Sequence, residues 1–113
     1  MGKAKFYLLY ASFDHKEIMK ILTIGNITKG VNWDKLDDVL KIEAKKVYQL
    51  YLEEYIREIY FTDTADVIII LECVNKKEAQ KLLNTLPLVK EKILHFTLYE
   101  LSPYSGFSRL MNN

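Results

Sequence analysis

Five consecutive apolar residues, Val67 to Leu71, constrain the fold of this chain more than any other feature. They belong to the segment VIIILECV (67–74), which has the length of a strand and is rich in β-branched residues. A strand of an antiparallel sheet with one face in water normally carries a polar residue at every second position. Both faces of this strand must therefore be covered.

Three more strands are predicted around that run, each rich in aromatic and aliphatic residues and free of Gly and Pro. They are KFYLLYASF (5–13), IREIYFT (56–62) and ILHFTLYEL (93–101). The turn-forming residues 63–66 separate the second of these from the apolar run. The two neighbouring segments should form a hairpin.

Helices are predicted where apolar residues recur at three- and four-residue intervals. The clearest covers 34–55, with Asn32 as its cap, and another follows Asn75, with Glu78 completing a capping box. A short helix is expected over 14–22, and the stretch 25–32, which contains Gly and Asn, is expected to be a loop.

The order of these elements is that of the split βαβ arrangement. It predicts an α+β, ferredoxin-like chain: a four-stranded antiparallel sheet with two helices on one face. The 113 residues suffice for one such unit, so residues 1–113 are expected to form a single domain.

The sheet face without helices is expected to be large and hydrophobic. Strand alternation assigns to it Leu8, Tyr10, Tyr60, Ile68, Ile70 and Tyr99. A soluble monomer rarely exposes such a patch, so something should cover it.

RNA and a second copy of the chain are the two covers considered. RNA-recognition domains stack bases on aromatic residues in a basic, glycine-containing third strand, whereas VIIILEC here is neither aromatic nor basic. The 16 basic and 15 acidic residues leave a net charge of +1, which creates no overall field toward nucleic acid. A second copy is favoured, because two such sheets close a barrel that can hold a small apolar ligand.

Other classes of partner and cofactor find little support in the sequence. No stretch approaches the roughly 20 apolar residues of a membrane span, so no membrane association and a cytoplasmic location are expected. Cys73 is the only cysteine, which excludes an internal disulfide. His15 and His95 lack a second ligand at metal-binding spacing, and neither a metal nor a cofactor is predicted.

The segment Leu82-Leu83-Asn84-Thr85-Leu86-Pro87-Leu88, followed by a strand and Ser102-Pro103-Tyr104, resembles the end of the muconolactone isomerase family. The resemblance implies a dimeric α/β barrel of ferredoxin-like subunits. It also implies an enzyme that works without a cofactor, by proton transfer on an apolar unsaturated carbonyl compound. A non-catalytic binding or structural barrel protein is the alternative.

Glu72 and Glu58 are the candidate acid/base residues. If Thr62 pairs with Ile68, then Glu58 lies opposite Glu72, and one of two facing carboxyls should retain its proton. The alternative for Glu72 is an ion pair with Arg57 or a lysine. The candidate substrate-binding residues are Tyr10, Tyr60, His95 and Tyr99.

The C-terminal tail carries Tyr104, Phe107 and Leu110 at every third position. These are too many apolar groups for a free terminus. The tail is therefore expected to pack against the body of the chain or against a partner subunit.

Overall fold

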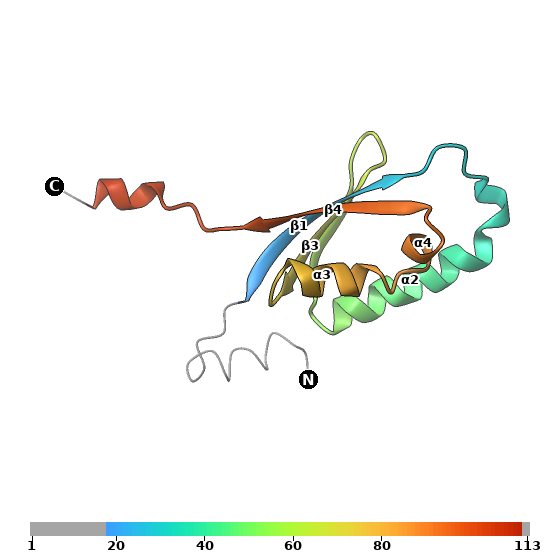
Figure 1. Ribbon diagram of the computed structural model, residues 1–113, viewed down its shortest axis with the longest axis horizontal. Helices are drawn as coiled ribbons and strands as arrows, with labels where there is room; N and C mark the ends of the chain where they lie inside the picture. The colour runs from blue at the N-terminus through green and yellow to red at the C-terminus, as the bar shows by residue number, and fades with distance from the viewer. Residues whose placement is uncertain (1–17, 112–113) are drawn as a thin grey trace.

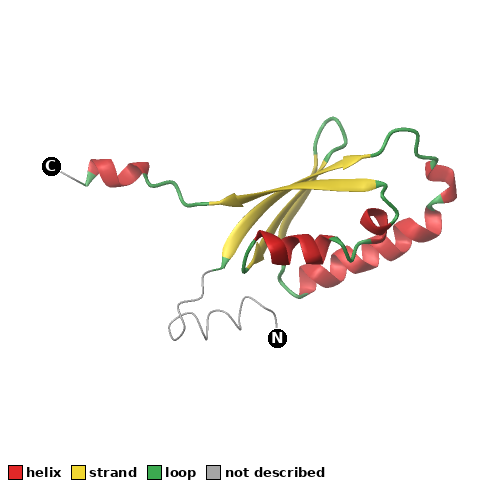
Figure 2. Ribbon diagram, in the orientation of Figure 1, coloured by secondary structure: helices red, strands yellow, loops and turns green. Residues whose placement is uncertain are grey.

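The computed structural model describes residues 18–111, which form an antiparallel sheet with its main helices on one face (Figure 1, Figure 2). In chain order the elements are β1 (Met19–Ile27), the 3-10 helix η1 (Trp33–Lys35), α2 (Asp37–Leu52), β2 (Ile56–Phe61), β3 (Val67–Cys73), α3 (Lys76–Leu83), α4 (Pro87–Lys90), β4 (Leu94–Leu101) and the 3-10 helix η2 (Gly106–Leu110).

The four strands lie in the order β2-β3-β1-β4, and each neighbouring pair is antiparallel. This order, together with the crossovers through α2 and α3, is that of the ferredoxin-like arrangement. The predicted α+β class and four-stranded antiparallel sheet are thus confirmed. The hairpin of β2 and β3 and the last strand also lie where the sequence places them.

The first strand of this sheet differs from the prediction. The short helix expected over 14–22 is wrong, because residues 19–27 form β1 in the centre of the sheet. Ile21 and Thr23 are buried while Leu22 and Ile24 are only partly so, which is the two-residue period of a strand. The strand expected over 5–13 lies outside the described residues.

Gly25 belongs to β1 and not to the predicted loop. A Cβ atom at this position would lie 2.7 Å from Cε1 of Phe96 and 2.9 Å from Cδ1 of Leu94, both on β4. The glycine therefore allows the side chains of β4 to cross over the central strand.

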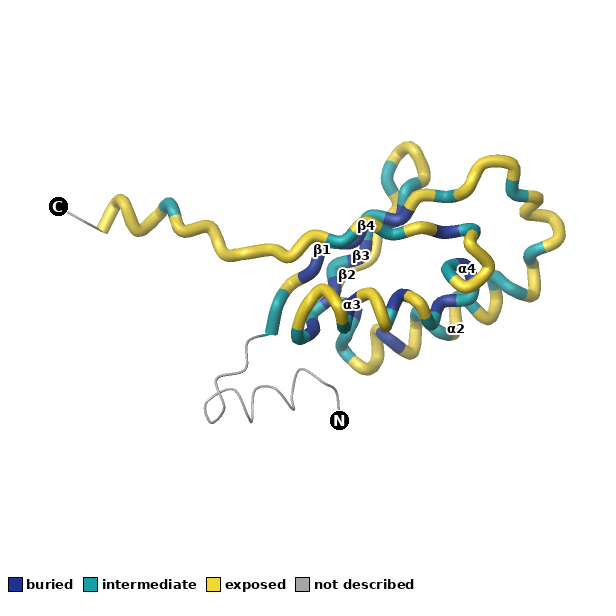
Figure 3. Tube along the Cα trace, viewed as in Figure 1, coloured by how far each residue is buried: buried dark blue, intermediate teal, exposed yellow. Residues whose placement is uncertain are grey.

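The hydrophobic core lies between the sheet and the helices (Figure 3). Its fully buried side chains include Ile21, Leu50, Ile69, Leu71, Cys73, Ala79 and Leu83. Cys73 faces the helices and is buried, as predicted. Thr23 is the one buried polar residue in the described part of the chain, and its hydroxyl donates a 2.9 Å hydrogen bond to the Ile69 carbonyl.

The predicted helix caps are partly confirmed. At α3, Asn75 Oδ1 accepts from the Glu78 amide at 2.8 Å, and Glu78 Oε1 accepts in return from the Val74 amide, also at 2.8 Å. Asn32, in contrast, caps η1 through the Asp34 amide, and α2 begins only at Asp37.

Two helices end with a residue in the left-handed region. After α2, Glu54 has a φ of 66°, and after α4, Lys92 has a φ of 59°. In each case the backbone amide of the next residue donates a hydrogen bond back to the helix. The Tyr55 amide donates to the Leu50 carbonyl, and the Ile93 amide donates to the Leu88 carbonyl. These are Schellman ends, at which glycine is the residue with least strain.

Lys92→Gly should therefore stabilise the protein, by roughly 0.5–1 kcal/mol, since relief of left-handed strain outweighs the added freedom of the unfolded chain. Lys90→Gly, inside α4, should destabilise it by a similar amount. Urea denaturation of both variants measures the two changes. Equal destabilisation by the two glycines would contradict this account of the α4 end.

Candidate functional site

The pairing of β2 with β3 does not bring Glu58 opposite Glu72. Glu58 pairs with Ile70 and Tyr60 with Ile68, a shift of two residues from the predicted register. Residues 62–66 form a longer loop than expected, closed by a 2.9 Å hydrogen bond from the Thr62 amide to the Asp66 carbonyl. The predicted pair of facing carboxyls is therefore not formed.

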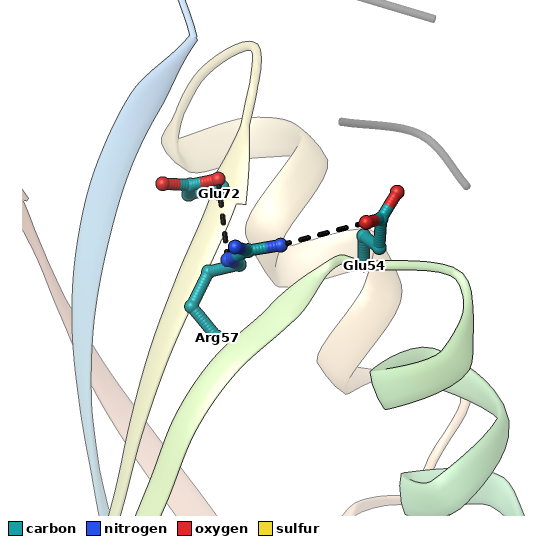
Figure 4. Close-up of polar contacts among 3 residues, drawn as sticks. All are labelled: Glu54, Arg57 and Glu72. Atoms are coloured by element: carbon teal, nitrogen blue, oxygen red, sulfur yellow. Dashed lines mark ion pairs between the residues drawn. The ribbon is translucent and has the colours of Figure 1, made fainter. Parts of the chain in front are cut away.

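Glu72 is instead paired with Arg57, one of the alternatives that the sequence leaves open. The ladder shifts between Ile56 and Glu58, so that Arg57 is an extra residue on β2, as in a β-bulge. Arg57 Nε lies 3.5 Å from Glu72 Oε1, and Arg57 Nη1 lies 3.9 Å from Glu54 Oε1 (Figure 4). The partner of Glu72 is therefore a cation and not a second carboxyl.

Glu58 accepts a 2.8 Å hydrogen bond from the Tyr60 hydroxyl. Both side chains are exposed on β2. The hydrogen bond and the negative charge of the carboxylate raise the pKa of Tyr60, because ionisation would remove the donor and place two anions together.

The other predicted pocket residues are separated from one another. His95 Nε2 lies 2.9 Å from Oγ1 of Thr28, whose hydroxyl donates to the Lys92 carbonyl at 2.8 Å, so His95 is the donor in this contact. Tyr99 lies opposite Leu22, four residues further along β4, and is about half exposed. Tyr10 lies outside the described residues.

The open sheet face has an apolar centre and a polar border. Leu22, Ile24, Ile68 and Ile70 occupy the central strands and are only partly buried. Around them, the register and alternation place Lys20, Asn26, Glu58, Tyr60, Glu72, His95, Thr97 and Tyr99. The predicted placement of Ile68, Ile70, Tyr60 and Tyr99 on this face is confirmed, whereas Leu8 and Tyr10 fall outside the described residues.

A cleft lies on the other side of the sheet. It has a volume of about 490 Å³ and lies between α2 and the sheet. Its wall is almost wholly apolar, with contributions from all four strands and from η1, α2 and α4. Trp33, Ile59 and Phe61 are exposed members of this wall.

The cleft exists because α2 packs closely against the sheet only near its C-terminal end. Leu50, in the last turn, is the buried residue of this helix, whereas Leu40 and Val47 are partly exposed. The part of α2 before its last turn therefore leaves space above β2 and β3, and Leu40 and Val47 line it.

Glu43 is the one ionisable side chain that lines the cleft in the described chain. Its Oε1 accepts a 2.9 Å hydrogen bond from the Leu88 amide. Burial raises the pKa of Glu43, and the Leu88 hydrogen bond opposes that shift less strongly. A half-buried carboxyl in an apolar cleft can hold a ligand's donor group or exchange a proton with it.

Sequence reasoning missed Glu43, although a signal was present. Glu43 follows Leu40 by three residues and precedes Val47 by four, which places it within the apolar stripe of the predicted helix. A carboxylate at such a position departs from the pattern of an ordinary amphipathic helix and is a candidate for a site.

Comparison with models of known protein families gives no match, and comparison with curated proteins finds no similar relative. Among residues 18–111, no cluster of three or more His, Cys, Asp or Glu side chains could hold a metal ion. Over the same residues, no helix has both the length and the apolar character needed to cross a membrane.

We expect Glu43 to make stability depend on pH. Its pKa in the folded protein lies above 4.5, so its protonated form adds stability that is complete below about pH 4.5 and is lost as the pH rises through the raised pKa. Glu43→Gln keeps an acceptor for the Leu88 amide but cannot titrate. The melting temperature of the wild type minus that of Glu43→Gln should therefore fall between about pH 4 and about pH 8. A difference that is constant with pH would count against a desolvated carboxyl.

Proposed function

We propose that the protein is a homodimer that binds a small, largely apolar molecule in the cleft between α2 and the sheet. The observation that carries this proposal is the single half-buried carboxyl in an otherwise apolar cleft of about 490 Å³. Small-molecule sites commonly have this size and combine an apolar wall with few polar groups.

The chemistry of the cleft limits the class of ligand. Glu43 Oε1 is already engaged by Leu88, so a ligand would meet the second carboxylate oxygen. That oxygen accepts a hydrogen bond when ionised and can donate one when protonated. The ligand should therefore have an apolar body with one polar group, such as a hydroxyl, amine or carbonyl.

The open sheet face supports the dimer. Its apolar centre, formed by residues such as Ile24 and Ile70, has the composition of an interface core, and the polar residues around it that of a rim. The charged groups on this face balance, since Lys20 and Arg57 are offset by Glu58 and Glu72. A neutral, self-complementary face suits a second copy better than it suits RNA.

The edges of the sheet support the same arrangement. Within residues 18–111, β2 and β4 each have a strand neighbour on one side only, so each leaves a row of backbone groups without a strand partner among these residues. Closing two sheets into a barrel removes such edges. This is the dimeric α/β barrel that the resemblance to muconolactone isomerases implies.

Proton transfer is the second candidate function, and the raised pKa of Glu43 favours it. In an isomerisation of this type, the carboxylate removes a proton from the carbon next to a carbonyl. The resulting acid returns the proton to the far end of the shifted double bond. A carboxyl whose pKa lies nearer neutrality is better suited to both steps.

Binding in the cleft is tested with N-phenyl-1-naphthylamine, a neutral apolar probe that fluoresces when it leaves water. Ala44 lines the cleft and Lys45 does not. Ala44→Trp should fill the cleft and weaken probe binding at least about tenfold, whereas Lys45→Trp on the same helix should leave it unchanged. Equal binding by both variants would place the probe elsewhere and refute the proposed site.

The dimer is tested by light scattering. The wild type should have about twice the 13.3 kDa chain mass, because an obligate interface of this kind buries on the order of 2,000 Å² or more. Ile70→Lys should be monomeric, since it places a charge in the centre of the contact. Tyr48→Lys, on the exposed side of α2, should remain dimeric. A folded wild-type monomer at micromolar concentration would refute the dimer but not the ligand site.

The proton-transfer candidate is tested with α-angelica lactone in D₂O, observed by NMR. The wild type should accelerate deuterium incorporation next to the carbonyl, and Glu43→Gln should lose at least about a hundredfold of that rate. If the wild type binds the apolar probe but gives no exchange above buffer, the binding function stands and this proton transfer is excluded.

A further inference from the structure

Residues 102–111, here called the C-terminal arm, leave the end of β4 and point away from the sheet (Figure 1). The four large apolar side chains of the arm, Tyr104, Phe107, Leu110 and Met111, are each between 67% and 81% exposed. The expected packing of the tail against the body of its own chain is therefore not found among residues 18–111. Such a set of apolar groups requires another cover.

The arm has a defined local shape even though it projects from the body. The rings of Tyr104 and Phe107 stack edge to face with centroids 5.0 Å apart. Gly106 lies under the Tyr104 ring, where a Cβ atom would overlap the ring. Residues 106–110 form η2. A segment that is ordered before it binds loses less entropy on docking.

The topology determines where the arm of one copy meets a second copy. β2 and β4 are the two edges of the sheet and run in opposite directions, since the order β2-β3-β1-β4 is antiparallel throughout. In a barrel of two sheets related by a two-fold axis along the strands, β4 of one copy lies beside β2 of the other. The two strands then run antiparallel, so the end of β4 lies beside the start of β2.

The start of β2 follows the end of α2, and this junction exposes two large apolar side chains beside charged ones. Tyr51 and Leu52 are both more than half exposed there. With Glu54, Ile56 and Arg57 they line a hollow of about 330 Å³. The position, hollow and apolar side chains fit a short aromatic segment such as the arm.

Charge supports the same match. Arg109 is the only charged residue of the arm. The turn after α2 carries two acidic residues, Glu53 and Glu54. Arg57 also lines the hollow, 3.9 Å from Glu54, so the two glutamates and this one arginine leave a net negative charge for Arg109 to approach.

We propose that the C-terminal arm of each copy docks on the α2–β2 junction of the other, so that two arms are exchanged across the dimer. This inference rests on the proposed homodimer, but it is independent of what the cleft binds. Tyr104 and Phe107 supply the apolar contact with Tyr51 and Leu52, and Arg109 faces the acidic turn.

Cysteine cross-linking tests the exchange. The variant Leu52→Cys/Leu110→Cys is treated with bismaleimidoethane, a short cross-linker, while Cys73 stays native because it is fully buried. The expected product is a covalent dimer on a denaturing gel. A cross-link within one chain would give a monomer of altered mobility and overturn the proposal.

Phe61→Cys/Leu110→Cys is the matched control, because Phe61 is exposed at the opposite end of β2. It should give at least about tenfold less covalent dimer than the first variant, since the antiparallel arrangement keeps the arm away from that end. Equal or greater cross-linking through Phe61 would refute the docking site.

Deletion of residues 102–113 separates this inference from the proposed dimer. Light scattering over a dilution series should show a dissociation constant at least about tenfold higher than that of the full chain, because the open sheet faces remain and the arm contacts are lost. An unchanged dissociation constant would overturn arm exchange and leave the sheet-face dimer intact. A monomeric full chain would overturn both.

Discussion

The antiparallel pairing of β1 with both β3 and β4 is the interaction on which the rest of the structure depends. β1 joins the hairpin of β2 and β3 to the last strand, and without it the sheet would fall into two parts. The buried Thr23 hydroxyl donates a hydrogen bond to the Ile69 carbonyl and so adds a contact between β1 and β3. Gly25, which has no side chain, lets the side chains of β4 pack closely against β1. One face of this sheet then carries the core, and the other is left open.

The cleft follows from how the helices cover that core face. Leu50, near the end of α2, is buried in the core, and the helix lines the cleft from Leu40 to Val47. Glu43 is held at this place by the Leu88 amide, so that the chain keeps a carboxyl in an apolar wall despite the cost of desolvation. The Leu88 hydrogen bond offsets part of that cost, and the second carboxylate oxygen is the group that the proposed ligand would meet.

The open face and the C-terminal arm present the same problem, because both leave apolar side chains such as Ile70 and Phe107 without enough cover in a single chain. The proposed two-fold dimer would cover both at once. The faces would cover each other, and the topology would bring each arm to the far subunit's α2–β2 junction. The two proposals are thus linked by geometry while each retains its own test.

The sequence alone determined the fold class, the β2–β3 hairpin, α3 with its Asn75 cap and the orientation of Cys73 toward the helices. These features follow from the spacing of apolar residues and from helix capping, which both depend only on residues close together in the chain. Tertiary structure decided that residues 19–27 form the central strand, because a strand between two others is stabilised by partners far away in the chain. It also decided that Glu72 meets Arg57 and not Glu58, because the register depends on a five-residue loop and a bulge. The cleft around Glu43 exists only once α2 has docked at one end.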